Sequence, residues 1–186
     1  MPRVIFMTST TLNGFLADEN DSLAWLFAVP EADDALAANA RFIDSIGVLV
    51  EGSSTYQWVL ANDDILAHPE KWQDFHGDRP TFVFTRRALP VVEGADIRLV
   101  RDSVTAVFPD MVAAAGDKDI WVVGGGDLAG QFLDAGLLDE LIIQIAPATL
   151  IGGAPLLPRE LGADRLHLAG VTRRGQFAEL HYRVTR

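Results

Sequence analysis

Cysteine is absent from this sequence, and its absence excludes several classes of site. The chain can form no disulfide framework, no thiolate nucleophile and no cysteine-based metal site. Histidine is scarce, with 4 residues in 186. His68 and His76 form no metal-ligand pattern with a nearby carboxylate pair. We therefore expect no metal site and predict that both imidazoles lie at the surface.

Long apolar runs and basic stretches are also missing. No run of 18 apolar residues could form a transmembrane helix, and Val4–Met7 is too short for a signal peptide. We expect a cytoplasmic protein without a membrane partner. The formal net charge of −11 argues against a nucleic-acid partner, which would require a basic surface. No repeat, low-complexity tract or linker interrupts residues 1–186, so we expect a single domain.

The most informative stretch begins with the apolar run Ile120–Val123, which stops at Gly124–Gly126. An amphipathic segment follows over residues 128–136, and a second β-branched run covers Leu141–Ile145. This order predicts a strand, a tight turn, a helix and a strand. Glycines let the backbone approach an anion at the positive end of the helix, although they could also serve only to pack the turn. The order G-x-G-x-x-G of the dinucleotide fingerprint is not present.

The remaining pattern predicts an α/β fold: a mainly parallel sheet with helices on both faces and an antiparallel C-terminal hairpin. Pro30 and Pro109 are each expected at the first position of a helix, because an interior proline removes a hydrogen bond. We predict further strands at residues 4–7, 48–50, 81–84, 97–100, 166–171 and 177–184, and helices at 30–46, from 53 onwards, once within 62–79, and at 109–115.

Several segments together resemble the dihydrofolate reductase-like superfamily, in the branch of the riboflavin-pathway deaminase-reductase. They are Thr11–Ala17, Val123–Gly126, Gln131–Leu133, Leu138–Leu141 and Pro147–Pro158. The resemblance covers most of the chain, with residues 60–80 the least informative. It implies a three-layer α/β/α fold and a reductase standing alone, since 186 residues are too few to include the deaminase. It also implies a homodimer, for which the hairpin and Ile151–Pro155 are candidate contacts.

The same resemblance implies NADPH as cofactor and places its binding residues at the ends of strands. The family has an arginine where this chain has Ser53, and that arginine reaches the additional phosphate of NADPH. Its loss makes the preference for NADPH over NADH uncertain, unless Arg86 or Arg87 supplies the cation; the alternative is a plain surface pair. A flavin stays open as another phosphate-bearing cofactor. The predicted cofactor residues are Thr8, Ser9, Gly52, Ser53, Ser54, Thr55, Thr85, Arg86, Arg87, Gly124, Gly125, Gly126, Asp127 and Leu128.

On the substrate side, the resemblance points to Asn13, Asp21 and Trp25. Asn13 stands where the family has aspartate, so a neutral amide replaces a carboxylate. In classical dihydrofolate reductases an acid directly precedes a Leu-Ala-Trp-like segment. Here Ser22 precedes Leu23 and Asp21 is one residue further back. Asp21 is the candidate proton donor, with an exposed turn aspartate as the alternative, and Trp25 is a candidate pocket wall.

The resemblance implies hydride transfer from NADPH to a small heterocyclic substrate. The family's named reaction, reduction of 5-amino-6-(5-phosphoribosylamino)uracil, needs donors for a sugar phosphate. Before Arg86 the only cations are Arg3, Arg41, Lys71 and Arg79, and none lies in a phosphate motif. Dihydrofolate reduction proper is one alternative. A non-catalytic dinucleotide-binding dimer is another, because Asn13, Ser53 and Asp21 all depart from the family pattern.

Overall fold

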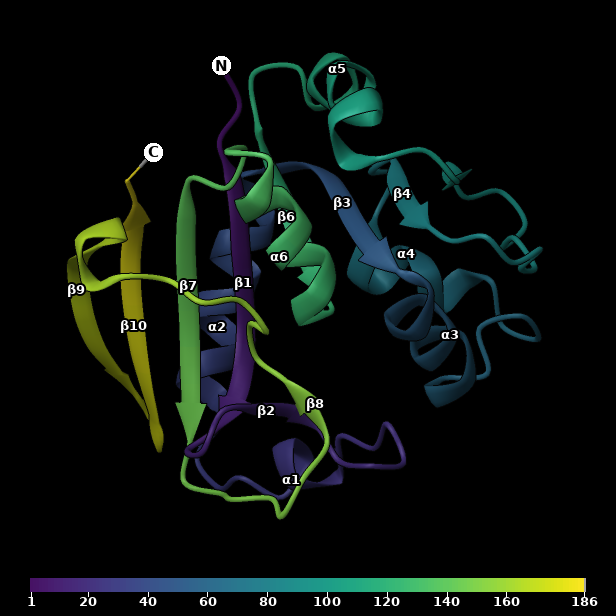
Figure 1. The fold of residues 1–186 in the computed structure, drawn as a ribbon. Helices are drawn as coiled ribbons and strands as arrows, with labels where there is room; N and C mark the ends of the chain where they lie inside the picture. Colours follow the sequence, from purple (N-terminus) through teal and green to yellow (C-terminus); the bar gives the residue numbers. More distant parts are fainter. Residues whose placement is uncertain (186) are drawn as a thin grey trace.

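A computed structural model describes residues 1–185 and is built around one eight-stranded sheet (Figure 1). Its strands are β1 Val4–Thr11, β3 Ile46–Gly52, β4 Thr81–Phe84, β5 Ile97–Val100, β6 Asp119–Gly124, β7 Glu140–Ala146, β9 Leu166–Arg174 and β10 Phe177–Val184. Their order in space is β5-β4-β3-β6-β1-β7-β10-β9. Neighbours run parallel from β5 to β7, whereas β10 pairs antiparallel with β7 and β9. The predicted parallel sheet and terminal hairpin are confirmed.

Helices cover both faces of this sheet, as predicted. On one face, α5 Val104–Ala115 and α6 Gly126–Asp134 pack against Val4 and Phe6 of β1. On the other face, α2 Asp33–Asp44 packs against Ile5 and Met7. The same side carries α3 Ser53–Asn62 and α4 Glu70–His76. Alternate residues of β1 thus enter different clusters, because successive side chains of a strand point to opposite faces. Burial explains why the strand is apolar on both sides.

Shorter elements close the carboxyl edge of the sheet. Strands β2 Phe15–Ala17 and β8 Ala154–Pro155 form a small antiparallel sheet. Helix α1 Ala24–Phe27 lies beside them at the bottom of Figure 1. The 3₁₀ turn η1 Ala163–Arg165 precedes the hairpin. The βαβ crossover is also present: β6 and β7 both pair parallel with β1, and α6 connects them across one face.

Two helix starts differ from the prediction. Helix α5 begins at Val104, and Pro109 lies inside it. The Ser103 hydroxyl caps this helix by accepting from the Ala106 N–H at 3.3 Å, while Val104, Val107 and Met111 bury their side chains. Capping and apolar burial outweigh the one hydrogen bond that the proline lacks. Pro30 precedes α2, which begins only at Asp33.

Candidate functional site

Strand ends with small and polar residues meet at one edge of the sheet. Gly52 at the end of β3 is aligned with Phe84 of β4, and Glu51 is aligned with Gly124 of β6. Thr8 continues β1 two residues beyond its last pair with β6, Phe6 with Val122. Ligands of open α/β sheets bind outside the carboxyl ends of the strands. The arrangement therefore places the predicted cofactor segments side by side.

Two helix N-termini face this edge. Helix α3 starts after Gly52 and α6 starts after Gly125, and neither has a side-chain cap. The two starts are close together, because a Cβ at Gly52, which precedes α3, would lie 3.6 Å from the backbone N of Gly125, which precedes α6. The peptide bond between Gly124 and Gly125 is cis. The first N–H groups of each helix lack intrahelical partners and carry partial positive charge, so together they offer donors for phosphate oxygens.

An arginine reaches the first residue of α3. The Arg87 guanidinium donates to the Ser53 hydroxyl at 3.0 Å, and the Arg87 N–H donates to the Thr85 hydroxyl at 3.0 Å. Arg86 is exposed beside it. Of the two arginines predicted to replace the missing cation, Arg87 is thus the one held at Ser53. Its role in binding a cofactor stays a prediction.

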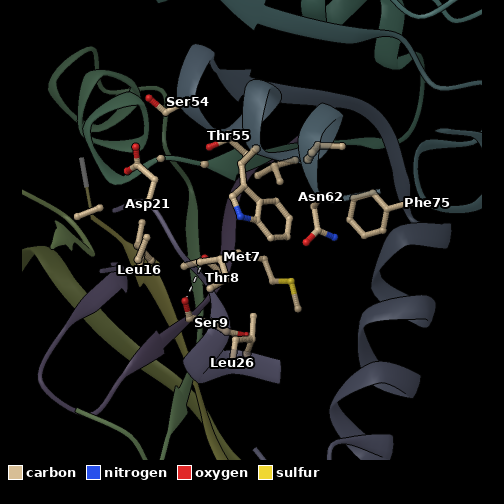
Figure 2. A pocket seen from close by; sticks show the side chains of 18 of the residues that line it. Met7, Thr8, Ser9, Leu16, Asp21, Leu26, Ser54, Thr55, Asn62 and Phe75 are labelled. Carbon is tan, nitrogen blue, oxygen red and sulfur yellow. Dashed lines mark hydrogen bonds between the residues drawn. The ribbon is translucent and has the colours of Figure 1, made fainter. Parts of the chain in front are cut away.

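A cavity of about 480 Å³ opens beside these segments. That volume lies within the range of small-ligand sites, about 300–1,000 Å³. The predicted residues that line the cavity are Thr8, Ser9, Asp21, Ser54, Thr55, Gly124 and Gly125. Figure 2 shows Ser54, Thr55 and Asp21 toward one end and Asn62 and Phe75 toward the other. Gly52, Ser53, Thr85, Arg86 and Arg87 flank the cavity without lining it.

Three predicted residues of α6 are used within the protein. Gly126 packs so tightly on the Pro155 and Leu156 carbonyls that a side chain there would clash with them. Leu128 is buried in the core. The Asp127 carboxylate accepts from Gln131 at 3.0 Å and pairs with Arg159 at 3.1 Å, and both contacts lower its pKa. The side chains of Asp127 and Leu128 therefore have structural partners, and only the backbone of this turn faces the site.

Asn13 and Trp25 also lie outside the cavity lining. The Asn13 amide donates to the Leu150 carbonyl at 2.6 Å and accepts from the Leu150 N–H at 3.2 Å, which ties the turn after β1 to the segment after β7. Trp25 packs against the cluster that contains Val29 and Phe177. Both contacts are structural, and the predicted roles of these residues toward a substrate stay predictions.

Asp21 lines the cavity but is exposed. It stands in a tight turn with φ 58°, where its N–H donates to the Asp18 carbonyl at 3.1 Å. This is the exposed turn aspartate that the sequence left open. A proton donor at this position would act from the cavity rim and not from a buried pocket.

A buried acid–base pair escaped the sequence analysis. Glu51 is fully buried at the end of β3, and one carboxylate oxygen lies 3.0 Å from Nε2 of His76, which is 1% exposed. His76 stacks on Trp72 with ring centroids 3.5 Å apart and lines the cavity. The prediction of a surface His76 is wrong. The spacing of four residues places Trp72 and His76 on one face of α4, but it does not show the partner Glu51, which lies 25 residues away in the chain.

The hydrogen-bonding atoms of Glu51 and His76 do not all have partners. Glu51 Oε2 and His76 Nδ1 are buried without a hydrogen-bond partner among the described residues. Nearby, burial raises the pKa of Tyr56 to about 12, and the charge of Glu51 adds to the shift. The Tyr56 hydroxyl donates to the Pro90 carbonyl at 2.7 Å. A carboxylate thus stands in the low-dielectric interior directly behind the cavity wall.

Two kinds of feature are missing from residues 1–185. No group of three or more His, Asp or Glu side chains in this part of the chain could hold a metal ion. None of its helices has the length and the apolar character needed to cross a membrane.

Known proteins resemble this chain over nearly its full length. The uncharacterised protein YwjB of Bacillus subtilis (strain 168) is 24% identical over 97% of both chains. The uncharacterised protein YyaP of the same organism is 27% identical over 83% of this chain and 79% of its own. A crystal structure from Shewanella sp. PV-4, provisionally assigned to riboflavin biosynthesis, covers 99% of both chains with a TM-score of 0.78 and 25% identity.

RibD of Acinetobacter baumannii shares the fold, with a TM-score of 0.71 and 18% identity. All of this chain aligns with 58% of that RibD chain, so RibD is the longer protein. The sequence model of the family called RibD C-terminal domain matches residues 62–178, which is more than half of this chain. By that match, the protein belongs to the RibD C-terminal domain family.

Proposed function

We propose that the protein is an NADPH-dependent reductase that delivers a hydride to a small heterocyclic substrate. Its family is one of NADPH-dependent pyrimidine reductases. The observation that carries the proposal is the meeting of two uncapped helix N-termini with the Ser54 and Thr55 hydroxyls at one cavity, next to Ser53, to which Arg87 donates. Donors of this kind suit a phosphate-rich dinucleotide. Gly125 adds to the fit, because a side chain there would meet open space.

The residues of the site would bind and orient the two reactants. Backbone N–H groups at the starts of α3 and α6 would hold the pyrophosphate, with the Ser54 and Thr55 hydroxyls beside them. Thr8 and Ser9 would face the nicotinamide end, where they line the cavity. When bound, the reduced nicotinamide supplies the hydride. The protein contributes proximity, orientation and a source for the accompanying proton.

Arg87 is the proposed determinant of NADPH over NADH. Its guanidinium lies on Ser53, at the position where the sequence pattern of the family has an arginine. The cation thus comes from the segment after β4 and not from α3. Charge-assisted hydrogen bonds to phosphate contribute about 1.5–3 kcal/mol each, so this residue should discriminate between the two nucleotides.

Asp21 is the proposed proton donor, because it is the one carboxylate of the rim that the family resemblance places near the substrate. The test is NADPH oxidation at 340 nm with a panel of pterins and pyrimidines, with wild type and Asp21→Asn. Turnover that falls at least about tenfold in Asp21→Asn, with NADPH affinity retained, supports the role. Saturable NADPH binding without turnover of any compound would instead favour the non-catalytic dinucleotide-binding dimer.

We also propose a homodimer. The edge strand β9 exposes the apolar side chains Leu168 and Val171, and Ile151 is exposed in the segment before β8. Exposed apolar groups on an edge strand favour association with another chain. Sedimentation velocity of wild type and Val171→Lys tests this proposal: a dimer that dissociates in the variant supports it, and a wild-type monomer at high concentration contradicts it.

A further inference from the structure

The cavity has a second end, remote from the glycine turn, whose character limits what it can bind. Phe75 of α4 lies there, with the ring of Trp121 of β6 at 5.7 Å and Met7 of β1 in the same apolar cluster as Trp121. Trp58 and Val59 of α3 also line the cavity. We call these five residues the aromatic end. In Figure 2, Met7, Asn62 and Phe75 surround this part of the cavity, away from Ser54. Apolar and aromatic walls favour a flat ring, which buries much apolar surface between rigid side chains.

Positive charge is almost missing from the cavity. Among the described residues that line it, Lys71 is the only lysine or arginine, and its ammonium group donates to the Asp63 carbonyl at 2.9 Å. Two carboxylates, Asp21 and Asp63, line the same cavity. Asp21 lies toward Ser54 in Figure 2, whereas Asp63 follows Asn62, which lies toward the aromatic end. The charge of Asp63 disfavours an anion there, and the formal net charge of −11 acts in the same direction.

The other lysine and arginine side chains before Arg86 are held elsewhere. Arg3 pairs with Asp119 and, at 2.9 Å, with Glu140. Arg79 donates to the carbonyls of Ile46 at 2.9 Å and His76 at 3.1 Å. Arg41 is exposed on α2 and does not line the cavity. None of them is placed to receive a phosphate at the aromatic end.

Neutral amides supply the polar contacts instead. Asn39, Asn62 and Gln144 line the cavity. Gln144 is 1% exposed and its amide is already engaged, because Nε2 donates to Asn39 Oδ1 at 2.9 Å and to Glu179 Oε2 at 3.0 Å and Oε1 accepts from the Ser9 hydroxyl at 3.2 Å. Asn62, near Phe75 in Figure 2, is the amide that lies toward the aromatic end. Amides can donate to and accept from the edge of a heterocycle without requiring charge. The donors that suit phosphate are confined to the other end, at the starts of α3 and α6.

We propose that the aromatic end selects a flat, uncharged heteroaromatic ring that carries no phosphate. The proposal names the substrate class of the proposed reductase and rests on that function for turnover, but ring binding can be measured without it. The substrate proposed for this chain differs from the one in the name of a solved Thermotoga maritima structure. That structure is named as a 5-amino-6-(5-phosphoribosylamino)uracil reductase and shares the fold at 15% identity. That substrate carries a phosphate.

The test is calorimetric titration of the full chain with a matched pair of ligands. The pair is 5-amino-6-(5-phosphoribosylamino)uracil and the same compound after enzymatic removal of its phosphate, with lumazine as a bare bicyclic ring. Each is titrated with and without saturating NADPH. We expect the dephosphorylated compound and lumazine to bind at least about tenfold more tightly than the phosphorylated one, with a gap that narrows as salt increases. Equal or tighter binding of the phosphorylated compound would overturn the proposal.

Variants test the role of the aromatic side chains and the role of the negative charge separately. Trp58→Leu should weaken ring binding about tenfold, whereas Phe108→Leu, which replaces a partly buried aromatic on the opposite face, should not change it. Asp63→Asn should narrow the gap between the phosphorylated and dephosphorylated compounds, because it removes a repelling charge. NADPH binding without binding of any unphosphorylated ring would overturn this inference and leave the cofactor proposal standing. Ring binding without NADPH binding would do the reverse.

Discussion

At the scale of single residues, Glu51 and His76 carry a large energetic consequence. Both are buried, and each is the other's partner in a hydrogen bond of 3.0 Å. Removing one partner of a buried pair leaves the other without compensation, which typically costs about 3–5 kcal/mol. Replacing charge while keeping the hydrogen bond costs far less.

We therefore predict that His76→Ala lowers the free energy of unfolding by about 3 kcal/mol and Glu51→Gln by about 1 kcal/mol. The double variant should lose less than the sum of the two, because the amide no longer leaves a buried charge unpaired. Urea denaturation of the four proteins measures this cycle. Strict additivity would show that the two side chains are not energetically coupled.

Tyr56 gives a pH-dependent prediction at the same scale. Its folded-state pKa of about 12 exceeds the ordinary value of 10.0, so the native state holds the phenolic proton more tightly than the unfolded state. The free energy of unfolding should be unaffected by this group below pH 10 and should fall as the pH rises to about 12. Each unit corresponds to about 1.4 kcal/mol, so up to about 3 kcal/mol is lost.

Absorbance at 295 nm against pH, together with urea denaturation at pH 9 to 12, measures both quantities. Tyr56→Phe is the control, since it removes the titrating group and should lose the corresponding pH-dependent part of stability. A wild-type Tyr56 that ionises near pH 10 would contradict the burial described here.

At the scale of elements, the glycines of the turn between β6 and α6 differ in whether packing within the protein requires them. A side chain at Gly126 would collide with the backbone carbonyls of Pro155 and Leu156, whereas one at Gly125 would meet open space. Gly126 is therefore required by packing, whereas no packing contact among the described residues requires Gly125. Sequence alone left packing and anion binding open for all three glycines.

The paired substitutions Gly125→Ala and Gly126→Ala test this division. We predict that Gly126→Ala destabilises the fold by about 1–3 kcal/mol through overpacking. Gly125→Ala should leave the melting temperature of the free protein nearly unchanged but weaken NADPH binding about tenfold, because its methyl group fills the space that the phosphate needs. Thermal melts with and without NADPH measure both effects. Equal NADPH affinity in Gly125→Ala and wild type would remove this turn from the site.

At the scale of the whole molecule, periodicity predicted the sheet well because the central strands contain short apolar runs followed by polar or small residues and β10 alternates between apolar and polar side chains. It failed at Pro109, where capping by Ser103 and buried Val104 and Met111 keep the helix continuous. It failed again at His76, because burial of a histidine depends on Glu51, a partner 25 residues away in the chain. The sequence predicted that Arg86 or Arg87 would supply the cation near Ser53. It did not decide between them, because the direction of each side chain depends on the conformation of the loop after β4.

The most direct measurement of the central claim is thermal unfolding with NADPH and NADH, for wild type and Arg87→Ala. At about 100-fold saturation a ligand adds about 2.7 kcal/mol to the free energy of unfolding, which raises the melting temperature by about 5–10 °C in a chain of this size. We expect such a rise for NADPH with wild type, a smaller rise for NADH, and loss of the difference between the two nucleotides in Arg87→Ala. No shift with either nucleotide would contradict the proposed reductase.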